Sequence, residues 1–310
     1  MKVELSDEVR DAVDTRGPVV ALESTIFSHL GLPSPANADA LDRCLKAIRG
    51  AGAVPAITAV LDGVVRAGLE PHEHERILGA AHKAAERDLG VAAAQGWPFG
   101  ATTVSASLAI AAAAGVSVFA TDSAGGEHRD TGGIGGVHRG SEITGDVSAD
   151  LDAIARYDVV TVCAGAKAFL DLARTLEHLE TIGVPVLGWC HDWFPAFYTR
   201  SSGLRVAHRV DSAAEVAMSH RARSRGGTLL TVPIPESDQL DQETLDQVVD
   251  EALRHCAETG ISGPGVTPFV LARIGEATAG RSVPANLALA ENNAAVAARV
   301  AVEISRIDGN

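Results

Sequence analysis

The chain has 310 residues, enough for one large or two ordinary domains, and 46% of them are hydrophobic. Its formal net charge of −14 argues against binding to a nucleic-acid backbone, because proteins that bind one normally present a basic face. Four widely spaced cysteines indicate neither a disulfide framework nor a zinc knuckle, and the sequence shows neither a signal peptide nor a membrane span. We therefore expect a cytoplasmic protein with no membrane or nucleic-acid partner.

Short apolar strands alternate with helical segments from the first quarter of the chain. A strand over Val19–Leu22 is followed by a helix over Ala36–Gly50, whose leucines lie near helical spacing. Strands over Val54–Leu61 and Val64–Ala67 flank Asp62-Gly63, a dipeptide typical of type I′ hairpin turns. This part of the sequence predicts alternating strands and helices with one antiparallel hairpin.

The alternation continues toward the C-terminus. Helices are expected over Glu73–Arg87, Thr103–Ala114, Ser148–Tyr157, Phe169–Ile182, Ala213–Arg221, Leu240–Glu258, Pro268–Ala277 and Pro284–Arg306. Strands are expected over Val116–Ala120, Val159–Cys163, Val184–Leu187 and Thr228–Val232. This order predicts an α/β fold, a three-layer α/β/α sandwich with a mainly parallel central sheet. Since no long Pro/Ser-rich linker interrupts it, we expect a single domain over residues 1–310.

A ten-residue motif occurs twice in succession after the strand at 116–120. Thr121–Asp130 reads TDSAGGEHRD and Thr131–Gly140 reads TGGIGGVHRG, so the threonine, the glycine pair and the His-Arg pair recur in register. Glycine-rich backbone that leaves a strand can turn sharply and approach a ligand closely. The run is neither a Walker loop nor a dinucleotide fingerprint, which leaves a generic phosphate- or sugar-binding loop. Its His138 is either a ligand contact or a structural residue.

Lysine is scarce, because only Lys2, Lys46, Lys83 and Lys167 occur among the 26 Lys and Arg residues. Arginine can replace lysine where only positive charge is needed, but not where a neutral amine must attack a carbonyl. Lys167 follows the strand at 159–163 through a small-residue turn, at the sheet edge where open α/β folds bind ligands. Partial desolvation there favours the neutral amine that a Schiff base requires; the alternative is a solvated lysine at a helix start.

Glu23 and the segment around Asp146 are further candidates. Glu23 directly follows a strand, where it serves either in proton transfer or in capping and salt bridging. Asp146 precedes the helix start Ser148-Ala149-Asp150, whose backbone amides could hold a phosphate while the carboxylate holds a divalent cation. Ordinary N-capping explains the same residues. Lys83, expected on a helix face, either meets a phosphate or sugar oxygen or is solvated.

These residues lie in segments that resemble the pseudouridine-5′-phosphate glycosidase family, also called the indigoidine synthase A-like family. The segments run in order along nearly the whole chain: Val20–Ser28 (VALESTIFS), Gly52–Leu61 (GAVPAITAVL), Gly100–Val104 (GATTV), Thr131–Gly140 (TGGIGGVHRG), Asp146–Leu151 (DVSADL), Val162–Lys167 (VCAGAK), Phe194–Arg200 (FPAFYTR), Pro233–Glu236 (PIPE) and Val266–Leu271 (VTPFVL).

The resemblance implies reversible cleavage of the C–C glycosidic bond of pseudouridine 5′-phosphate to uracil and ribose 5-phosphate, through a lysine imine with the ring-opened sugar. It implies that Lys167 carries the imine, that Glu23 donates the proton and that Asp146 holds Mn²⁺ or another divalent cation. It also implies a homotrimer of single-domain α/β subunits. Substrate contacts are implied for Lys83, Val104, Thr131, His138, Ser148, Ala149, Asp150 and Asn286.

The sequence departs from the family pattern near the implied substrate. Ten residues, Asp122–Thr131 or an equivalent frame, are added in the doubled motif; the second copy keeps the family motif, and the first is expected to form a lid or rim. Trp97 and Phe99 replace a short polar turn, and Val232 replaces an asparagine. These changes motivate a second hypothesis, a C-ribosyl synthase that joins ribose 5-phosphate to a non-uracil acceptor. A third, a catalytically silent sugar-phosphate binder, is disfavoured because the lysine and the acid are retained.

Overall fold

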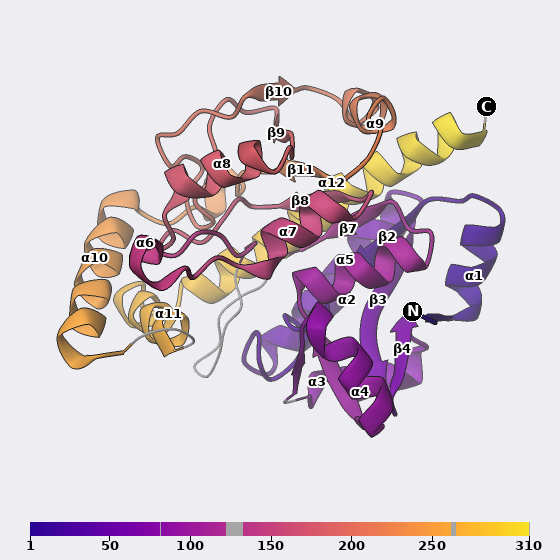
Figure 1. Ribbon diagram of the computed structural model, residues 1–310, viewed down its shortest axis with the longest axis horizontal. Helices are drawn as coiled ribbons and strands as arrows, with labels where there is room; N and C mark the ends of the chain where they lie inside the picture. Colours follow the sequence, from indigo (N-terminus) through magenta and orange to yellow (C-terminus); the bar gives the residue numbers. More distant parts are fainter. Residues whose placement is uncertain (81, 122–132, 262–264, 310) are drawn as a thin grey trace.

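The computed structural model describes residues 1–80, 82–121, 133–261 and 265–309, which form a central sheet flanked by helices (Figure 1). The strands are β1 (Glu4–Leu5), β2 (Val19–Leu22), β3 (Val54–Leu61), β4 (Val64–Ala67), β5 (Lys83–Ala84), β6 (Phe99–Thr102), β7 (Val118–Ala120), β8 (Val160–Cys163), β9 (Val186–Trp189), β10 (His208–Val210) and β11 (Thr228–Thr231). The helices are α1 (Asp7–Asp14), α2 (Ala36–Gly50), α3 (His74–Leu78), α4 (Leu89–Gln95), α5 (Val104–Ala113), α6 (Ser141–Thr144), α7 (Ala149–Arg156), α8 (Leu172–Thr181), α9 (Ala213–Arg221), α10 (Gln242–Thr259), α11 (Val266–Ala277) and α12 (Ser282–Gly309). Single 3₁₀ turns are η1 (Pro71–Glu73), η2 (Glu86–Asp88) and η3 (Glu236–Asp238).

One mainly parallel sheet contains all of these strands. Its order is β1-β4-β3-β2-β7-β8-β11-β9-β10, and β6 lies beside β3 with β5 at its outer side. Only β3–β4 and β3–β6 are antiparallel among the described pairs. Strands from both halves of the chain therefore share one sheet, while the single domain over 1–310 stays a prediction.

Side chains of β2 show how the layers form, because they alternate between two hydrophobic clusters. Val19 and Ala21 join a cluster that contains Leu108 of α5, and Val20 and Leu22 join one that contains residues of α2 and α12. Successive strand residues point to opposite faces, and a strand buried on both faces is apolar throughout. The three-layer α/β/α arrangement expected from the sequence is confirmed.

The early hairpin adopts the turn that its sequence predicts. Asp62 and Gly63 both have positive φ angles, of 51° and 75°, as a type I′ turn requires. A Cβ on Gly63 would lie 2.9 Å from the Cα of Gly96, so glycine is also needed for close packing.

The helix expected over Glu73–Arg87 was wrong. The segment instead contains η1, α3, the short strand β5 and η2. Helix α3 ends at Leu78 and is capped by Gly79, and β5 then pairs with β6, which places Lys83 beside Ala101. Strand pairing thus overrides the helix propensity of this Ala- and Lys-containing stretch.

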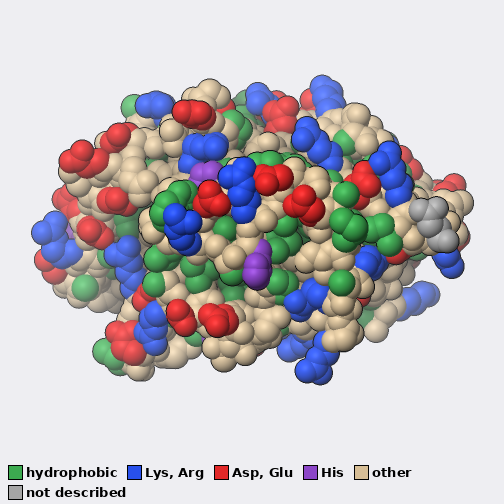
Figure 2. All heavy atoms as spheres, turned by 90° about the horizontal axis from the view of Figure 1, so that it is seen from above, with side chains coloured by type: hydrophobic (Ala, Val, Ile, Leu, Met, Phe, Trp, Pro, Cys, Tyr) green, Lys and Arg blue, Asp and Glu red, His purple; other side chains and the backbone are tan. Residues whose placement is uncertain are grey.

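The surface of the molecule carries charges of both signs, interspersed over the face seen in Figure 2. Every helix in the described part of the chain is too short or too polar to cross a lipid bilayer.

Candidate active site

Three neighbouring parallel strands end at the same level and bring the candidate catalytic residues to one edge of the sheet. Leu22 of β2 pairs with Ala120 of β7, and Ala120 pairs with Val162 of β8. Glu23 and Thr121 therefore emerge side by side at the carboxyl edge, and β8 ends one strand further on. With about 4.8 Å between strands, β8 lies about 10 Å from β2. Ligands of open α/β folds bind at such an edge.

Glu23 is buried and accepts a hydrogen bond from a threonine that the sequence analysis had not singled out. Only 2% of Glu23 and none of Thr121 is exposed. The Thr121 hydroxyl donates to Glu23 Oε1. Thr121 is itself fixed, because its N–H donates to the Val162 carbonyl at 3.0 Å and its carbonyl accepts from Asn293 Nδ2 at 3.3 Å. Its position directly after an apolar strand indicates the same sheet edge as Glu23, whereas the contact itself depends on the register of β2 against β7.

A buried group of hydroxyls fixes the backbone that follows Glu23. Ser24 Oγ lies 3.1 Å from Thr102 Oγ1, and Thr58 Oγ1 lies 2.8 Å from the same atom. The Thr25 hydroxyl donates to the Thr102 carbonyl at 2.5 Å. All four hydroxyl side chains are fully buried. They tie the end of β2 to the middle of β3 and the end of β6, which rigidifies the segment that carries the acid.

Lys167 lies four residues beyond β8, on a turn that only glycine can form. Gly165 has a φ of +81°, and a Cβ there would lie 2.0 Å from the Pro195 carbonyl oxygen. Gly133 contacts the turn from another side, since its Cβ would lie 3.0 Å from the Gly165 oxygen and 3.6 Å from the Lys167 nitrogen. Lys167 itself is half-buried. The second copy of the doubled motif therefore packs on the Lys167 turn.

The same glycine run is bonded to the start of α7. The Ser148 N–H donates to the Gly136 carbonyl at 3.0 Å, and the Gly135 N–H donates to Asp150 Oδ2 at 2.9 Å. The other Asp150 oxygen accepts from the Ser105 N–H of α5 at 3.2 Å. Ser148 caps α7 by accepting from the Asp150 N–H. The Asp150 carboxylate thus joins the glycine run to two helix N-termini.

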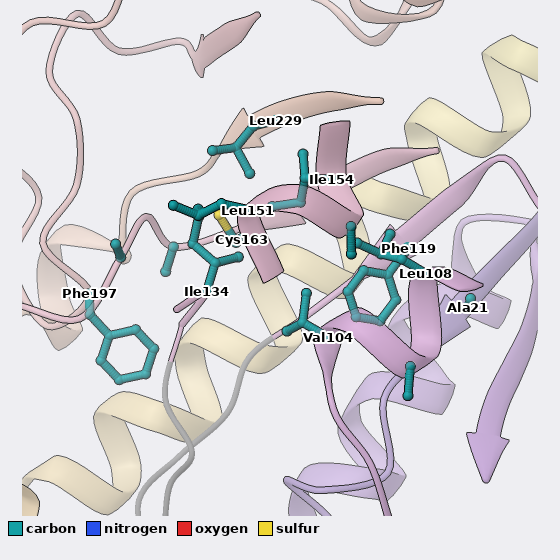
Figure 3. Close-up of a cluster of buried hydrophobic side chains, with 14 of the residues drawn as sticks. Ala21, Val104, Leu108, Phe119, Ile134, Leu151, Ile154, Cys163, Phe197 and Leu229 are labelled. Atoms are coloured by element: carbon teal, nitrogen blue, oxygen red, sulfur yellow. The ribbon is translucent and has the colours of Figure 1, made fainter. Parts of the chain in front are cut away.

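Val104, Ala149 and Lys83 occupy different settings around this edge. Val104 is 3% exposed and points into the core beside Phe119 and Leu108 (Figure 3), so its contact with a ligand would come from its backbone. Ala149 is exposed at the first position of α7, and Lys83 is exposed on β5. Thr131 lies outside the described residues.

Asn286 of α12 carries an unsatisfied buried oxygen. Its Nδ2 donates to the Tyr198 hydroxyl at 3.1 Å, whereas its Oδ1 has no hydrogen-bond partner among the described residues. Asn286 lies seven residues before Asn293, which places both on one face of the helix, and Asn293 reaches Thr121. Burial raises the pKa of Tyr198 to about 12, although Asn286 opposes this, so the phenol stays neutral. A buried unpaired oxygen is costly, which makes Asn286 a candidate to accept a donor from a ligand.

Asp146 and His138 are neighbours at the rim. The His138 N–H donates to the Asp146 carbonyl at 3.1 Å, and His138 Nδ1 lies 3.8 Å from Asp146 Oδ2. The described residues contain no cluster of three His, Cys, Asp or Glu side chains suited to a metal. The half-exposed carboxylate of Asp146 suits a hard divalent cation that keeps several of its water ligands and also binds a phosphate of the substrate.

Among the residues that depart from the family pattern, Trp97 and Phe99 lie beside the β3–β4 hairpin and Val232 lies in the core. The Trp97 carbonyl accepts from Gly63 at the β3–β4 turn, and Phe99 pairs with Leu61. Val232 is 1% exposed and joins the cluster that contains α12 residues. Val232 therefore contributes to the apolar packing under α12.

Comparison with known proteins identifies relatives along the whole chain. The family model described as "Indigoidine synthase A like protein" matches residues 8–303. The pseudouridine-5′-phosphate glycosidase of Caldanaerobacter subterraneus subsp. tengcongensis is 45% identical, over 98% of this chain and 97% of that protein. The enzyme of the same name from Escherichia coli K12 is 43% identical, over 99% of this chain and 97% of its own.

Two solved structures share the fold. The prealnumycin C-glycosynthase AlnA, crystallised in complex with ribulose 5-phosphate, has a TM-score of 0.89 and 36% identity, and the match covers 99% of this chain and 98% of that one. An indigoidine synthase A-like protein from Thermotoga maritima has a TM-score of 0.84 and 31% identity, with 98% and 97% coverage.

Proposed function

Because the chain belongs to the indigoidine synthase A-like family, we propose that it reversibly cleaves the C–C glycosidic bond of pseudouridine 5′-phosphate to give uracil and ribose 5-phosphate. The observation that carries the proposal is the arrangement at the sheet edge. The buried Glu23 follows β2, and the half-buried Lys167 follows β8, with only β7 between these two strands. Relatives that bear this enzyme name match almost the full chain.

The chemistry begins at Lys167. Its neutral amine attacks C1′ of the nucleotide, the bond from C1′ to the ring oxygen breaks, and the amine proton moves to that oxygen. The result is a ring-opened sugar with C1′ joined to both the lysine nitrogen and C5 of the base. The carbon–carbon bond is still intact at this stage.

Glu23 then provides the proton that lets the base depart. The carboxyl proton moves to C5, the electron pair of the C1′–C5 bond returns to the base ring, and the lysine nitrogen lone pair forms a C1′=N bond. Uracil leaves. Water adds to C1′, the resulting proton returns to the Glu23 carboxylate, and ribose 5-phosphate departs to regenerate the lysine amine.

The surrounding residues are assigned to substrate binding on the family resemblance and their positions. The N-terminus of α7, with Ser148, Ala149 and Asp150, would hold the phosphate through backbone amides. Lys83 and the Val104 backbone would contact the sugar phosphate, together with Thr131. Asn286 Oδ1 would accept an N–H of the base, and His138 would line the same region. Asp146 would hold Mn²⁺ or another divalent cation, which supplies positive charge beside the phosphate.

The similarity to AlnA favours a second candidate, a C-ribosyl synthase. The same lysine imine and the same carboxylate, run in reverse, would join ribose 5-phosphate to a non-uracil carbon nucleophile. Val232 and the ten added residues of the doubled motif distinguish this chain from the family pattern. Incubation with ribose 5-phosphate and uracil separates the two, since rapid formation of pseudouridine 5′-phosphate supports the first candidate.

We extend the proposal to a cytoplasmic homotrimer, as the family resemblance implies. All four cysteines are free thiols, which suits a reducing compartment. Sedimentation equilibrium of the purified chain tests the trimer.

Release of uracil from pseudouridine 5′-phosphate tests the main proposal. Lys167→Ala should abolish release, while Lys46→Ala should retain it, because Lys46 is exposed and pairs only with Asp42 on α2 among the described contacts. A wild-type protein that releases no uracil with Mn²⁺ present, or a Lys167→Ala variant that still releases it, contradicts the proposal.

A further inference from the structure

The contact between Thr121 and Glu23 assigns a role to the threonine that directly follows β7. Glu23 is buried, so its carboxyl group cannot be oriented by bulk water. Its Oε1 accepts from the Thr121 hydroxyl. A carboxyl oxygen that accepts such a bond is the carbonyl-type oxygen, and the proton of the neutral acid then lies on Oε2.

Thr121 is held well enough to impose this orientation. Its N–H bonds to Val162 of β8, its carbonyl bonds to Asn293 of α12, and its side chain is fully buried. Threonine also has a stiff, branched side chain. The hydroxyl therefore has a fixed origin on the sheet, level with the acid on the neighbouring strand.

We propose that Thr121 is a positioning residue that holds the Glu23 carboxyl group with its proton-bearing oxygen toward the base. Proton transfer to C5 is then fast enough that the adduct that still carries the base does not accumulate. This inference rests on the proposed function. It assigns to Thr121, the first residue of the doubled motif, a role distinct from that of the second copy, whose Gly133 packs on the Lys167 turn.

The test separates the step before carbon–carbon cleavage from cleavage itself. In Thr121→Val the branched shape is kept and the hydroxyl is lost. Lys167 should still attack C1′, but protonation of C5 should slow. We expect kcat for uracil release to fall about 10- to 100-fold, with KM changed less than threefold. Intact-protein mass spectrometry should then show an adduct that still carries the base, as it should in Glu23→Gln.

Two variants serve as controls. Thr121→Ser keeps the hydroxyl and should recover most of kcat without accumulating the base-bearing adduct. Thr228→Val removes a fully buried hydroxyl at the opposite edge of the sheet, where it contacts His220, and should turn over like the wild type.

Borohydride trapping of ribose 5-phosphate on each protein completes the design. Thr121→Val with wild-type kcat and no base-bearing adduct overturns the inference. So does a variant, Val or Ser, in which adduct formation and cleavage fall together, because that pattern indicates a merely structural role. If the wild type itself forms no adduct and releases no uracil, the proposed function fails instead.

Discussion

Asp150 is the residue whose carboxylate bonds to two separate segments of the site. It accepts from backbone N–H groups of the glycine run and of α5. Substrate binding by this residue stays a prediction, and the structure shows in addition that both carboxylate oxygens have protein partners. Its first effect on the site is therefore to hold Gly135 and the start of α5 together.

Asp150→Ala should lower the free energy of unfolding by about 1–3 kcal/mol, because two backbone donors lose their acceptor. Asp152→Ala is the matched control, since Asp152 is exposed in the same first turn of α7 and carries the same helix-dipole effect. We expect a change within about 0.5 kcal/mol for it. Urea unfolding measures both, and equal losses in the two variants would show that the bonds to Asp150 contribute nothing beyond the helix dipole.

At the scale of single residues, the sequence predicted positions better than contacts. Glu23 and Lys167 were placed at the carboxyl edge because strand order alone brings strand ends together. The bond from Thr121 could not be predicted, because it depends on the register of β2 against β7, which is set by packing on both faces of the sheet. Similarly, Lys83 was expected on a helix, but pairing with β6 places it on a strand.

Among the elements, the doubled motif carries two roles that the structure separates. Thr121 contacts the acid, while Gly133 packs on the Lys167 turn and Gly135 packs on Ser148 and Asp150 at the start of α7. The expected lid or rim formed by the first copy lies outside the described residues. The second copy, which keeps the family motif, packs on the Lys167 turn through Gly133, and its inherited role at the site stays a prediction.

Deleting Asp122–Thr131 should preserve imine formation and alter substrate choice. The deletion joins Thr121 directly to Gly132 and restores one copy, TGGIGGVHRG, so both sets of described contacts are retained. Two quantities are measured for the deletion variant and the wild type. The first is the yield of the borohydride-trapped adduct with ribose 5-phosphate, and the second is the relative rate at which uracil and other acceptors react. A folded deletion variant that forms no adduct would disprove the assignment of these ten residues as an insertion outside the core chemistry.

The long helices and parallel strands were predicted to within three residues at each end, because their apolar periodicity extends over several turns or is bounded by glycine and proline. The helix over Ala36–Gly50 and the helix over Ala213–Arg221 match α2 and α9. The short strands β1, β5, β6 and β10 were missed, since two to four residues carry too little pattern and form only through pairing with neighbours.

For the whole molecule, stability should depend on pH through His220. This side chain is buried on α9, and burial lowers its pKa below the ordinary 6.5, while Asp158 opposes the shift and Arg221 and Arg223 add to it. A group that is harder to protonate in the folded state binds more protons when unfolded, so the free energy of unfolding falls as pH decreases below about 6.5. Above that pH the contribution is constant.

Below about pH 6.5, the free energy of unfolding should therefore depend less steeply on pH in His220→Gln than in the wild type. The slope should differ by up to about 1.4 kcal/mol per pH unit. Burial also lowers the pKa of His74, so part of the slope should remain. Urea unfolding of wild type and variant at several pH values measures the difference. Identical slopes would show that His220 does not contribute.

The central claim for the molecule is covalent catalysis by Lys167 at the edge of the sheet. The most direct measurement is reduction with borohydride in the presence of ribose 5-phosphate and Mn²⁺, followed by proteolysis and mapping of the modified lysine by mass spectrometry. The chain has only three other lysines, Lys2, Lys46 and Lys83, so each position can be resolved. We predict one ribose 5-phosphate adduct, on Lys167. An adduct confined to another lysine, or none at all, would contradict the mechanism.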